Sequence, residues 1–298
     1  MLDVTSEELT DLLARAARLK AAWQQRIPSH VLAGRVLGLI FEKPSLRTRV
    51  SFEAAITQLG GTSLFFPGNE VGLGWRESLA DFARTMNQYV DAMVFRVFRQ
   101  STLEGIAQYA ACPVINGLSD LYHPCQAAAD MLTIQELFGT VRDKRIVFVG
   151  DGNNVARSVA ILTAKLGGHF VLASPPGYGF DAEFLERFAR IVSKQPLEQT
   201  DDPIAAIREA DIIYTDVWTS MGQEAEREER LKRFASFQVN TQLLSHAPAH
   251  AKVMHCLPAR RGEEITDEVI DGERSVVFQQ AGNRLHAQKA ILEWLLVG

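Results

Sequence analysis

The chain has 298 residues, 47% of them hydrophobic and 22% charged, with a formal net charge of −5 at pH 7. Its length exceeds what a single hydrophobic core usually organises, so we expect two globular domains. Acidic and basic residues are interspersed without a basic stripe, which argues against a nucleic-acid partner and for a small-molecule ligand.

The cysteines and the apolar runs predict a cytoplasmic protein without a membrane span. Cys112, Cys125 and Cys256 are odd in number and form no Cys-x-x-Cys pair, so neither a disulfide framework nor a zinc site is indicated. No stretch has the pattern of a signal peptide, and no run reaches the roughly 18 apolar residues of a transmembrane helix.

In chain order, the N-terminal half predicts a parallel α/β sheet. Thr5 and Glu8 form a capping-box pattern at the start of an amphipathic helix that extends to about Trp23. Apolar strand-like runs then alternate with helical patterns, as in a parallel sheet covered by helices. The predicted strands are Val36–Phe41, Ser63–Phe66, Ala92–Phe95 and Val114–Asn116.

A basic turn follows the first predicted strand. Ser45, Arg47, Thr48 and Arg49 precede a helix that we expect to begin at Val50. Its buried stripe is predicted at Phe52, Ala55, Ile56 and Leu59. Unpaired N–H groups at a helix N-terminus, together with guanidinium and hydroxyl groups, suit a dianionic phosphate. The alternative is a solvated basic turn.

Two later positions in this half also suit an anion. Arg96 follows a predicted strand, and ligands of open α/β sheets bind at the carboxyl ends of strands. His123 precedes Pro124, which suits a first helical turn, and Gln126 follows in that turn. Both side chains are therefore expected to point from a helix N-terminus. The alternatives are a solvated arginine and a histidine that caps its helix.

The C-terminal half repeats the strand and helix alternation. Predicted strands lie at Arg145–Val149, His169–Ala173, Asp211–Tyr214 and Lys252–Met254. The turn after the first of them, residues 150–155, resembles a dinucleotide fingerprint only in part. Val155 replaces the third glycine, and no acidic residue follows the next strand, so an NAD site is disfavoured.

Polar and potentially reactive side chains follow the last two predicted strands. Asp216 precedes the Ser220-Met221-Gly222 turn, and a carboxylate beside free N–H groups suits the two charges of an α-amino acid; the alternative is a plain turn at a strand end. Cys256 next to His255 fits a buried thiol, a nucleophile or a metal ligand. Residues 224–233 predict a solvated helix with Glu and Arg or Lys at i, i+4 spacing. The last helix should bury Ala287, Ile291, Trp294 and Leu295.

Five stretches, in order, resemble motifs of the aspartate and ornithine carbamoyltransferase family. They are residues 41–52, 123–126, 150–155, 216–222 and 255–258, and the likeness runs from about Leu12 to Leu296. Residues 216–222 are similar to the Asp-x-x-x-Ser-Met-Gly signature of the ornithine-specific members. The resemblance implies transfer of a carbamoyl group from carbamoyl phosphate to the δ-amine of ornithine, giving citrulline in arginine metabolism.

The resemblance also implies an architecture. It predicts an α/β fold of two domains, each a parallel β-sheet flanked by helices, with the C-terminal helix packing back on the first domain. Residues 1–138 with 283–298 would bind carbamoyl phosphate, and residues 139–282 would bind ornithine. The family further implies a homotrimer or an assembly of trimers, and we expect no cofactor and no metal ion.

Particular residues carry the implied roles. The expected carbamoyl-phosphate site consists of Ser45, Leu46, Arg47, Thr48, Arg96, His123, Gln126, Leu257 and Arg284. The expected ornithine site consists of Asn154, Asp216, Ser220, Met221 and Cys256. Within these sets Arg96, His123, Cys256 and Arg284 are the expected catalytic residues.

Three positions depart from the family pattern. Leu46 replaces a threonine, Gly72 replaces a polar residue in a loop that reaches the neighbouring subunit, and Gly282 replaces a glutamate. These departures leave open a non-catalytic paralogue that binds carbamoyl phosphate. Two further alternatives are an aspartate carbamoyltransferase, which would share the carbamoyl-phosphate pocket, and a transferase for a related amine such as putrescine.

Overall fold

The computed structural model describes residues 3–192, 197–219 and 224–298. The chain divides into two compact units. The N-terminal unit comprises residues Glu7–Leu132 and Asn283–Gly298, and the C-terminal unit comprises Thr133–Gly282 with the segment before Glu7. No helix within the described ranges combines the length and apolar character needed to cross a bilayer.

The N-terminal unit is built on a parallel sheet. Its strands, within the described residues, are β1 (Val36–Phe41), β2 (Thr62–Pro67), β3 (Ala92–Arg96) and β4 (Val114–Leu118), in the order β2-β1-β3-β4. All three neighbouring pairs are parallel. The predicted strands are confirmed, and β2, β3 and β4 extend slightly beyond the predicted bounds.

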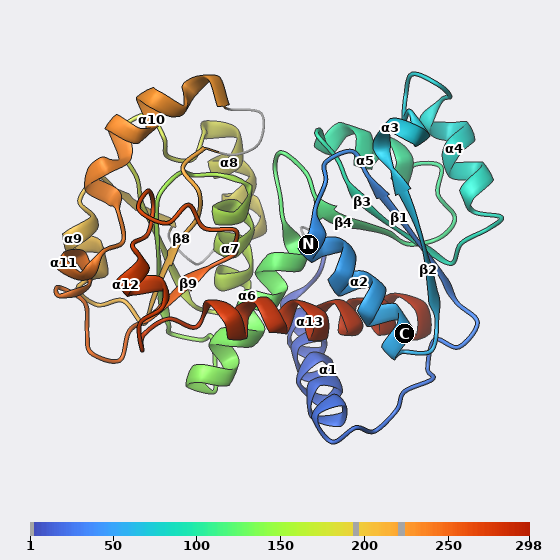
Figure 1. The fold of residues 1–298 in the computed structure, drawn as a ribbon, viewed down its shortest axis with the longest axis horizontal. Helices are drawn as coiled ribbons and strands as arrows, with labels where there is room; N and C mark the ends of the chain where they lie inside the picture. Colours follow the sequence, from blue (N-terminus) through green and yellow to red (C-terminus); the bar gives the residue numbers. More distant parts are fainter. Residues whose placement is uncertain (1–2, 193–196, 220–223) are drawn as a thin grey trace. The chain divides into compact units, whose positions relative to one another are not determined.

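Helices cover both faces of this sheet (Figure 1). They are α1 (Ser6–Gln24), α2 (Leu46–Gln58), α3 (Gly68–Val71), α4 (Leu79–Met86) and α5 (Gln100–Ala107). Helices α4 and α5 lie on one face, and α2 lies on the other. The predicted start of α2 at Val50 is wrong, because the helix already begins at Leu46, directly after its Ser45 cap.

The C-terminal unit has a second parallel sheet. Its strands are β5 (Arg145–Val149), β6 (His169–Ala173), β7 (Leu197–Thr200), β8 (Ile212–Thr215) and β9 (Lys252–His255), in the order β7-β6-β5-β8-β9. The surrounding helices are α7 (Asn154–Lys165), α8 (Ala182–Ile191), α9 (Pro203–Ile207), α10 (Arg227–Phe234), α11 (Thr241–Leu244) and α12 (Asp267–Ile270). Strand β7 was not predicted; it is a half-exposed edge strand with mostly polar residues.

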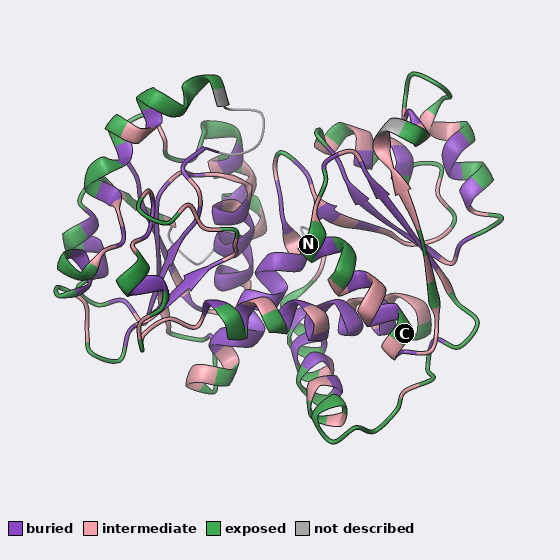
Figure 2. Ribbon diagram, viewed as in Figure 1, coloured by how far each residue is buried: buried purple, intermediate pink, exposed green. Residues whose placement is uncertain are grey.

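Each sheet forms the centre of its unit's hydrophobic core. Figure 2 shows the central strands of each sheet largely buried, whereas the edge strands β2 and β7 contain no buried residue. Exposed residues lie on the outer turns of the helices. Ile40, Met93 and Phe95 belong to the N-terminal core, and Val147 and Ile213 belong to the C-terminal one. The buried sheets hold the carboxyl ends of their strands in fixed positions, and the loops that follow them carry the predicted site residues.

Helix α6 (Pro124–Phe138) and helix α13 (Val277–Val297) complete the fold. The last helix packs back on the N-terminal unit, as predicted: Lys20 on α1 donates to Asn283 Oδ1 at 2.7 Å, and the rings of Trp23 and His286 lie 5.4 Å apart. Its predicted apolar stripe is only partly right. Ala287 is buried, but the other three members are half-buried, while polar residues fill much of the buried face. These are Asn283, Arg284, His286, Gln288, Lys289 and Glu293.

We expect Gly282→Ala to stabilise helix α13. Gly282 lies within the helix and is exposed, and a Cβ built on it meets no heavy atom within 4 Å. Alanine restricts the unfolded chain more than glycine does, so the free energy of unfolding should rise by about 0.5–1 kcal/mol. Urea denaturation measures the change. Gly152→Ala is the contrasting variant, because its Cβ would lie 2.8 Å from the Gly179 carbonyl carbon, and it should destabilise the protein.

Candidate active site

The predicted anion-binding residues of the N-terminal unit follow the carboxyl ends of three strands. Ser45 lies just beyond β1, Arg96 ends β3, and His123 lies between β4 and α6. Since carboxyl ends of parallel strands meet at one edge of a sheet, three separate segments of the sequence supply groups to the same edge.

Ser45 is the N-cap of helix α2. It has an extended backbone, and its hydroxyl oxygen accepts from the Thr48 N–H at 3.3 Å and lies 3.1 Å from Thr48 Oγ1. The cap satisfies one of the amide groups of the first turn, and the positive end of the helix dipole remains there. Leu46 is 75% exposed, and its side chain has no polar atom, so the position can contribute only its backbone N–H to such a site. Arg47 is also exposed.

Arg284 of helix α13 joins this turn to helix α6. Its guanidinium donates to Thr48 Oγ1 at 3.0 Å and to Gln126 Oε1 at 2.5 Å, and it is 3% exposed. The Gln126 amide in turn donates to Asp130 Oδ1 at 2.8 Å. The hydrogen bonds fix the orientation of the Gln126 amide, with its nitrogen toward Asp130. Asp130 was missed by the sequence analysis, although it stands one helical turn after Gln126.

His123 is buried in the neighbourhood of two arginines. Burial, and then the charges of Arg284 and Arg96, hold the pKa of His123 well below its ordinary value of 6.5. The imidazole is therefore neutral at pH 7 and can donate one hydrogen bond without carrying charge. Arg96 is likewise buried, with 7% exposure. A pair of buried guanidiniums with a neutral donor is an arrangement that suits a phosphate or a developing oxyanion.

The pKa of His123 predicts a pH dependence of stability. An unfolded chain protonates this histidine near pH 6.5, whereas the folded protein does not until a much lower pH. The contribution of His123 to stability is therefore full above pH 6.5 and falls by about 1.4 kcal/mol per pH unit below it. Urea denaturation from pH 7 to pH 5 of the wild type and of His123→Gln measures this. Identical slopes in the two proteins would contradict the assignment.

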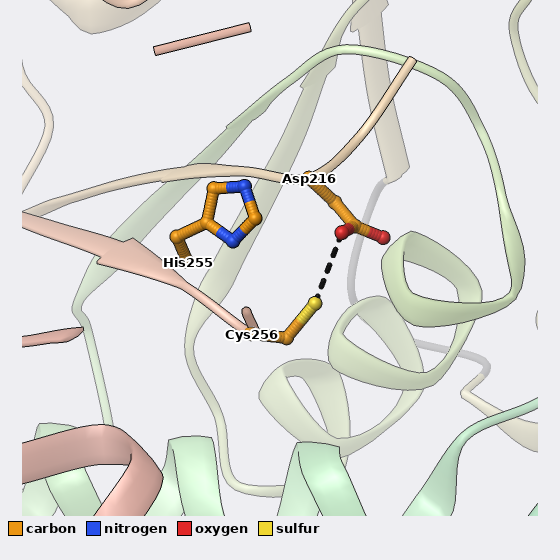
Figure 3. A group of neighbouring side chains, drawn as sticks. All are labelled: Asp216, His255 and Cys256. Atoms are coloured by element: carbon orange, nitrogen blue, oxygen red, sulfur yellow. Dashed lines mark hydrogen bonds between the residues drawn. The ribbon is translucent and has the colours of Figure 1, made fainter. Parts of the chain in front are cut away.

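In the C-terminal unit, Asp216 and Cys256 lie together at the ends of neighbouring strands β8 and β9 (Figure 3). The Cys256 thiol donates to Asp216 Oδ1 at 3.0 Å, and the side-chain amide of Asn153 donates to Asp216 Oδ2 at 2.9 Å. Asp216 is 7% exposed. The two donors hold the carboxylate in one orientation, where it can accept from an ammonium group.

Asn153, which was not predicted, contacts Asp216, whereas Asn154 was predicted to bind the carboxylate of the substrate. Asn153 caps helix α7 by accepting from the N–H groups of Val155 and Ala156, and the same side chain donates to Asp216. Asn154 is the first residue of α7 and is half-buried. The repeated Asn-Asn pair was the signal in the sequence. The predicted residues Ser220 and Met221 lie outside the described residues.

His255, Asp216 and Cys256 form the one group in the described chain whose ligand atoms lie close enough, within 4.8 Å, for a metal ion (Figure 3). Both ring nitrogens of His255 already have partners. Nδ1 accepts from the Leu257 N–H at 2.9 Å, and Nε2 lies 3.0 Å from Glu264 Oε1, so the ring proton is placed on Nε2. The imidazole thus acts as a fully buried structural group that supports the backbone at Leu257.

The charged helix α10 does more than form the predicted solvated face. Arg230 pairs with Glu226 as predicted, at 2.9 Å, but it is 6% exposed and also donates to Asp151 Oδ2 at 2.7 Å and to the Trp218 carbonyl at 2.9 Å. These contacts tie α10 to the loops that follow β5 and β8. The segment 216–219, which carries Asp216, is thereby anchored from one side by Arg230.

Two family models match consecutive parts of the chain. The model described as aspartate/ornithine carbamoyltransferase, carbamoyl-P binding domain, matches residues 1–136. The model described as aspartate/ornithine carbamoyltransferase, Asp/Orn binding domain, matches residues 142–295. Together they cover nearly the whole chain.

Curated and solved relatives match over the full length. Ornithine carbamoyltransferase of Pyrococcus abyssi is 50% identical over 299 residues, which is 99% of this chain and 94% of the relative. That of Bacillus subtilis is 49% identical and covers 99% of this chain and 92% of its own. The solved structure of ornithine carbamoyltransferase from Pyrococcus furiosus superposes with a TM-score of 0.96 at 48% identity, covering 100% of this chain and 96% of that one.

Proposed function

The chain belongs to the aspartate/ornithine carbamoyltransferase family, and we propose that it transfers the carbamoyl group of carbamoyl phosphate to the δ-amine of L-ornithine, giving L-citrulline and phosphate. The observation that carries the proposal is the hydrogen-bonded set of Thr48, Gln126 and Arg284 beside the capped N-terminus of α2. It is a buried cationic arrangement of the kind that suits a phosphate group.

We assign carbamoyl phosphate to the N-terminal unit. Its phosphate would be bound by Ser45, Arg47 and Thr48, by the first N–H groups of α2 including that of Leu46, and by the guanidiniums of Arg96 and Arg284. The carbamoyl oxygen would accept from His123, whose neutral imidazole donates without repelling the arginines. Gln126 would contact the carbamoyl nitrogen.

We assign ornithine to the C-terminal unit. The Asp216 carboxylate would accept from an ammonium group of the substrate, and the amide of Asn154 and the turn at Ser220 and Met221 would bind its carboxylate. Cys256, which already donates to Asp216, would line the pocket of the side-chain amine. Because this pocket pairs a carboxylate acceptor with N–H donors, it suits an amino acid better than a diamine such as putrescine.

The chemistry then needs no covalent enzyme intermediate. The neutral δ-amine attacks the carbamoyl carbon, the bond from that carbon to the phosphate oxygen breaks, and phosphate leaves with its electron pair and accepts the amine proton. An amine of ordinary pKa, near 10.4, must be deprotonated at a cost of about 4–5 kcal/mol at pH 7. A cationic phosphate pocket lowers that pKa, and His123 and the arginines stabilise the oxyanion at the carbamoyl carbon.

The test is citrulline formation from carbamoyl phosphate and ornithine, run beside aspartate, putrescine and N-acetylornithine at equal concentration. We expect turnover with ornithine and none above background with the others. Turnover with putrescine or aspartate in place of ornithine would overturn the substrate assignment. Folded protein that binds carbamoyl phosphate but turns over no amine would instead identify a non-catalytic paralogue.

A further inference from the structure

A cavity of about 390 Å³ lies within the N-terminal unit, away from the residues assigned to carbamoyl phosphate. Its walls come from helix α1, the segment 26–30, the end of helix α2 and one residue of helix α13, Lys289. Neither Thr48, Gln126 nor Arg284 lines it. Its volume falls within the range of small-molecule sites, which is about 300–1,000 Å³.

Lys289 is the buried cation of this cavity. Its side chain is 3% exposed, and no hydrogen bond or ion pair with any described residue involves it. Burial lowers the pKa of Lys289 to about 8, and no carboxylate opposes this shift. The other ionisable wall residues are Arg26 and His30, and no Asp or Glu lines the cavity. A buried ammonium without a counter-charge is costly, so an anion entering here would be stabilised.

The remaining wall provides an apolar surface and one unsatisfied acceptor. Leu19, Trp23, Ile27 and Leu59 contribute apolar atoms. Gln58 also lines the cavity, and its buried Oε1 accepts no hydrogen bond from the described residues. A buried acceptor of this kind is normally satisfied by a donor, whether on the protein, on water or on a ligand. The cavity, which is partly open to solvent, therefore combines a cation, an apolar surface and an acceptor.

We propose that this cavity is a second binding site, for a small organic carboxylate whose anionic group pairs with Lys289, whose aliphatic body packs on the apolar wall, and whose N–H or O–H group donates to Gln58 Oε1. An acylated aliphatic amino acid has all three features. Inorganic phosphate has the charge but lacks the apolar body, so it should prefer the arginine-rich set around Arg284.

The first test uses the wild-type protein and isothermal titration calorimetry at pH 7, with phosphate present throughout to occupy the site around Arg284. N-acetyl-leucine should bind with a Kd on the order of 1 mM, and the neutral N-acetyl-leucinamide, which differs only at the carboxylate, at least about tenfold more weakly. Equal affinity for both, or no binding of N-acetyl-leucine at about 10 mM, would overturn the proposal.

Two variants then locate the ligand. Lys289→Met should remove the preference for N-acetyl-leucine over its amide, whereas Lys232→Met, on the exposed face of α10, should leave it unchanged. Gln58→Leu should weaken N-acetyl-leucine severalfold but not 4-methylpentanoate, which has the same carboxylate and aliphatic body and lacks the N–H. A preference that survives Lys289→Met would contradict the site. The wild-type comparison remains decisive if that variant does not fold.

Discussion

Replacing Arg284 with methionine should nearly abolish citrulline formation. The guanidinium is almost fully buried and donates to Gln126 Oε1 at 2.5 Å and to Thr48 Oγ1 at 3.0 Å. Methionine fills similar space but removes the cation from the phosphate site together with the two hydrogen bonds that Arg284 donates. Loss of one preorganised donor to a transition-state charge typically costs about 10²–10³-fold in kcat, and we expect at least that loss here, measured at saturating ornithine.

Two variants separate charge from geometry. Arg284→Lys retains the cation but cannot donate in a planar fork to two acceptors on different helices, so it should recover only part of the activity. Arg208→Met removes an exposed arginine of the C-terminal unit and should retain full turnover. Circular dichroism and urea denaturation show whether Arg284→Met folds. A folded Arg284→Met protein with wild-type turnover would remove this residue from the mechanism.

The elements that sequence predicts well are those whose signal lies within a few residues. Strands β1, β5 and β6 have the predicted bounds because their apolar runs are uninterrupted, and both sheet faces bury them. Strand β7 was not predicted because its sequence contains no apolar run. It is an edge strand in which Glu198 and Gln199 are exposed. The start of α2 was placed late because Leu46 and Arg47 are exposed and add nothing to the buried stripe.

The site required information that local patterns do not contain. Arg284 contacts Thr48 across 236 positions and Gln126 across 158, and no spacing rule links such distant residues. The family resemblance identified these three residues, and the structure adds the hydrogen bonds between them. Spacing also could not identify Asn153 as the partner of Asp216, because that contact depends on the orientation of the side chain that caps α7.

Helix α13 shows a further limit of periodicity. The apolar residues of this segment have helical spacing, and the segment is a helix, as predicted: Ala287, Ile291, Trp294 and Leu295. Its buried face, however, also contains Arg284 and Lys289. Polar residues at buried positions contradict the usual pattern, and such contradictions are expected where a site has been built into the core. Arg284 fits the proposed phosphate site, and Lys289 lines the cavity proposed as a second binding site.

Asp216→Asn should impair ornithine use while sparing carbamoyl phosphate. The carboxylate is nearly buried and held by the Cys256 thiol at 3.0 Å and the Asn153 amide at 2.9 Å. Asparagine keeps the size but removes the charge that would pair with the substrate ammonium. Truncating one partner of a buried charge pair costs about 2–5 kcal/mol, so kcat/KM for ornithine should fall by roughly 30- to 5,000-fold.

The location of Asp216 makes this prediction selective. All the described residues assigned to the phosphate belong to the N-terminal unit, whereas Asp216 belongs to the C-terminal unit. The Kd for carbamoyl phosphate, measured by calorimetry without ornithine, should therefore not change. Asp201→Asn removes an exposed carboxylate of the same unit and should leave both substrates unaffected. Cys256→Ser retains a donor to Asp216 and should lose far less activity than Asp216→Asn. If Asp216→Asn weakened the binding of carbamoyl phosphate as much as the use of ornithine, the carboxylate would support the whole fold rather than one substrate. The assignment of ornithine to this pocket would then be wrong.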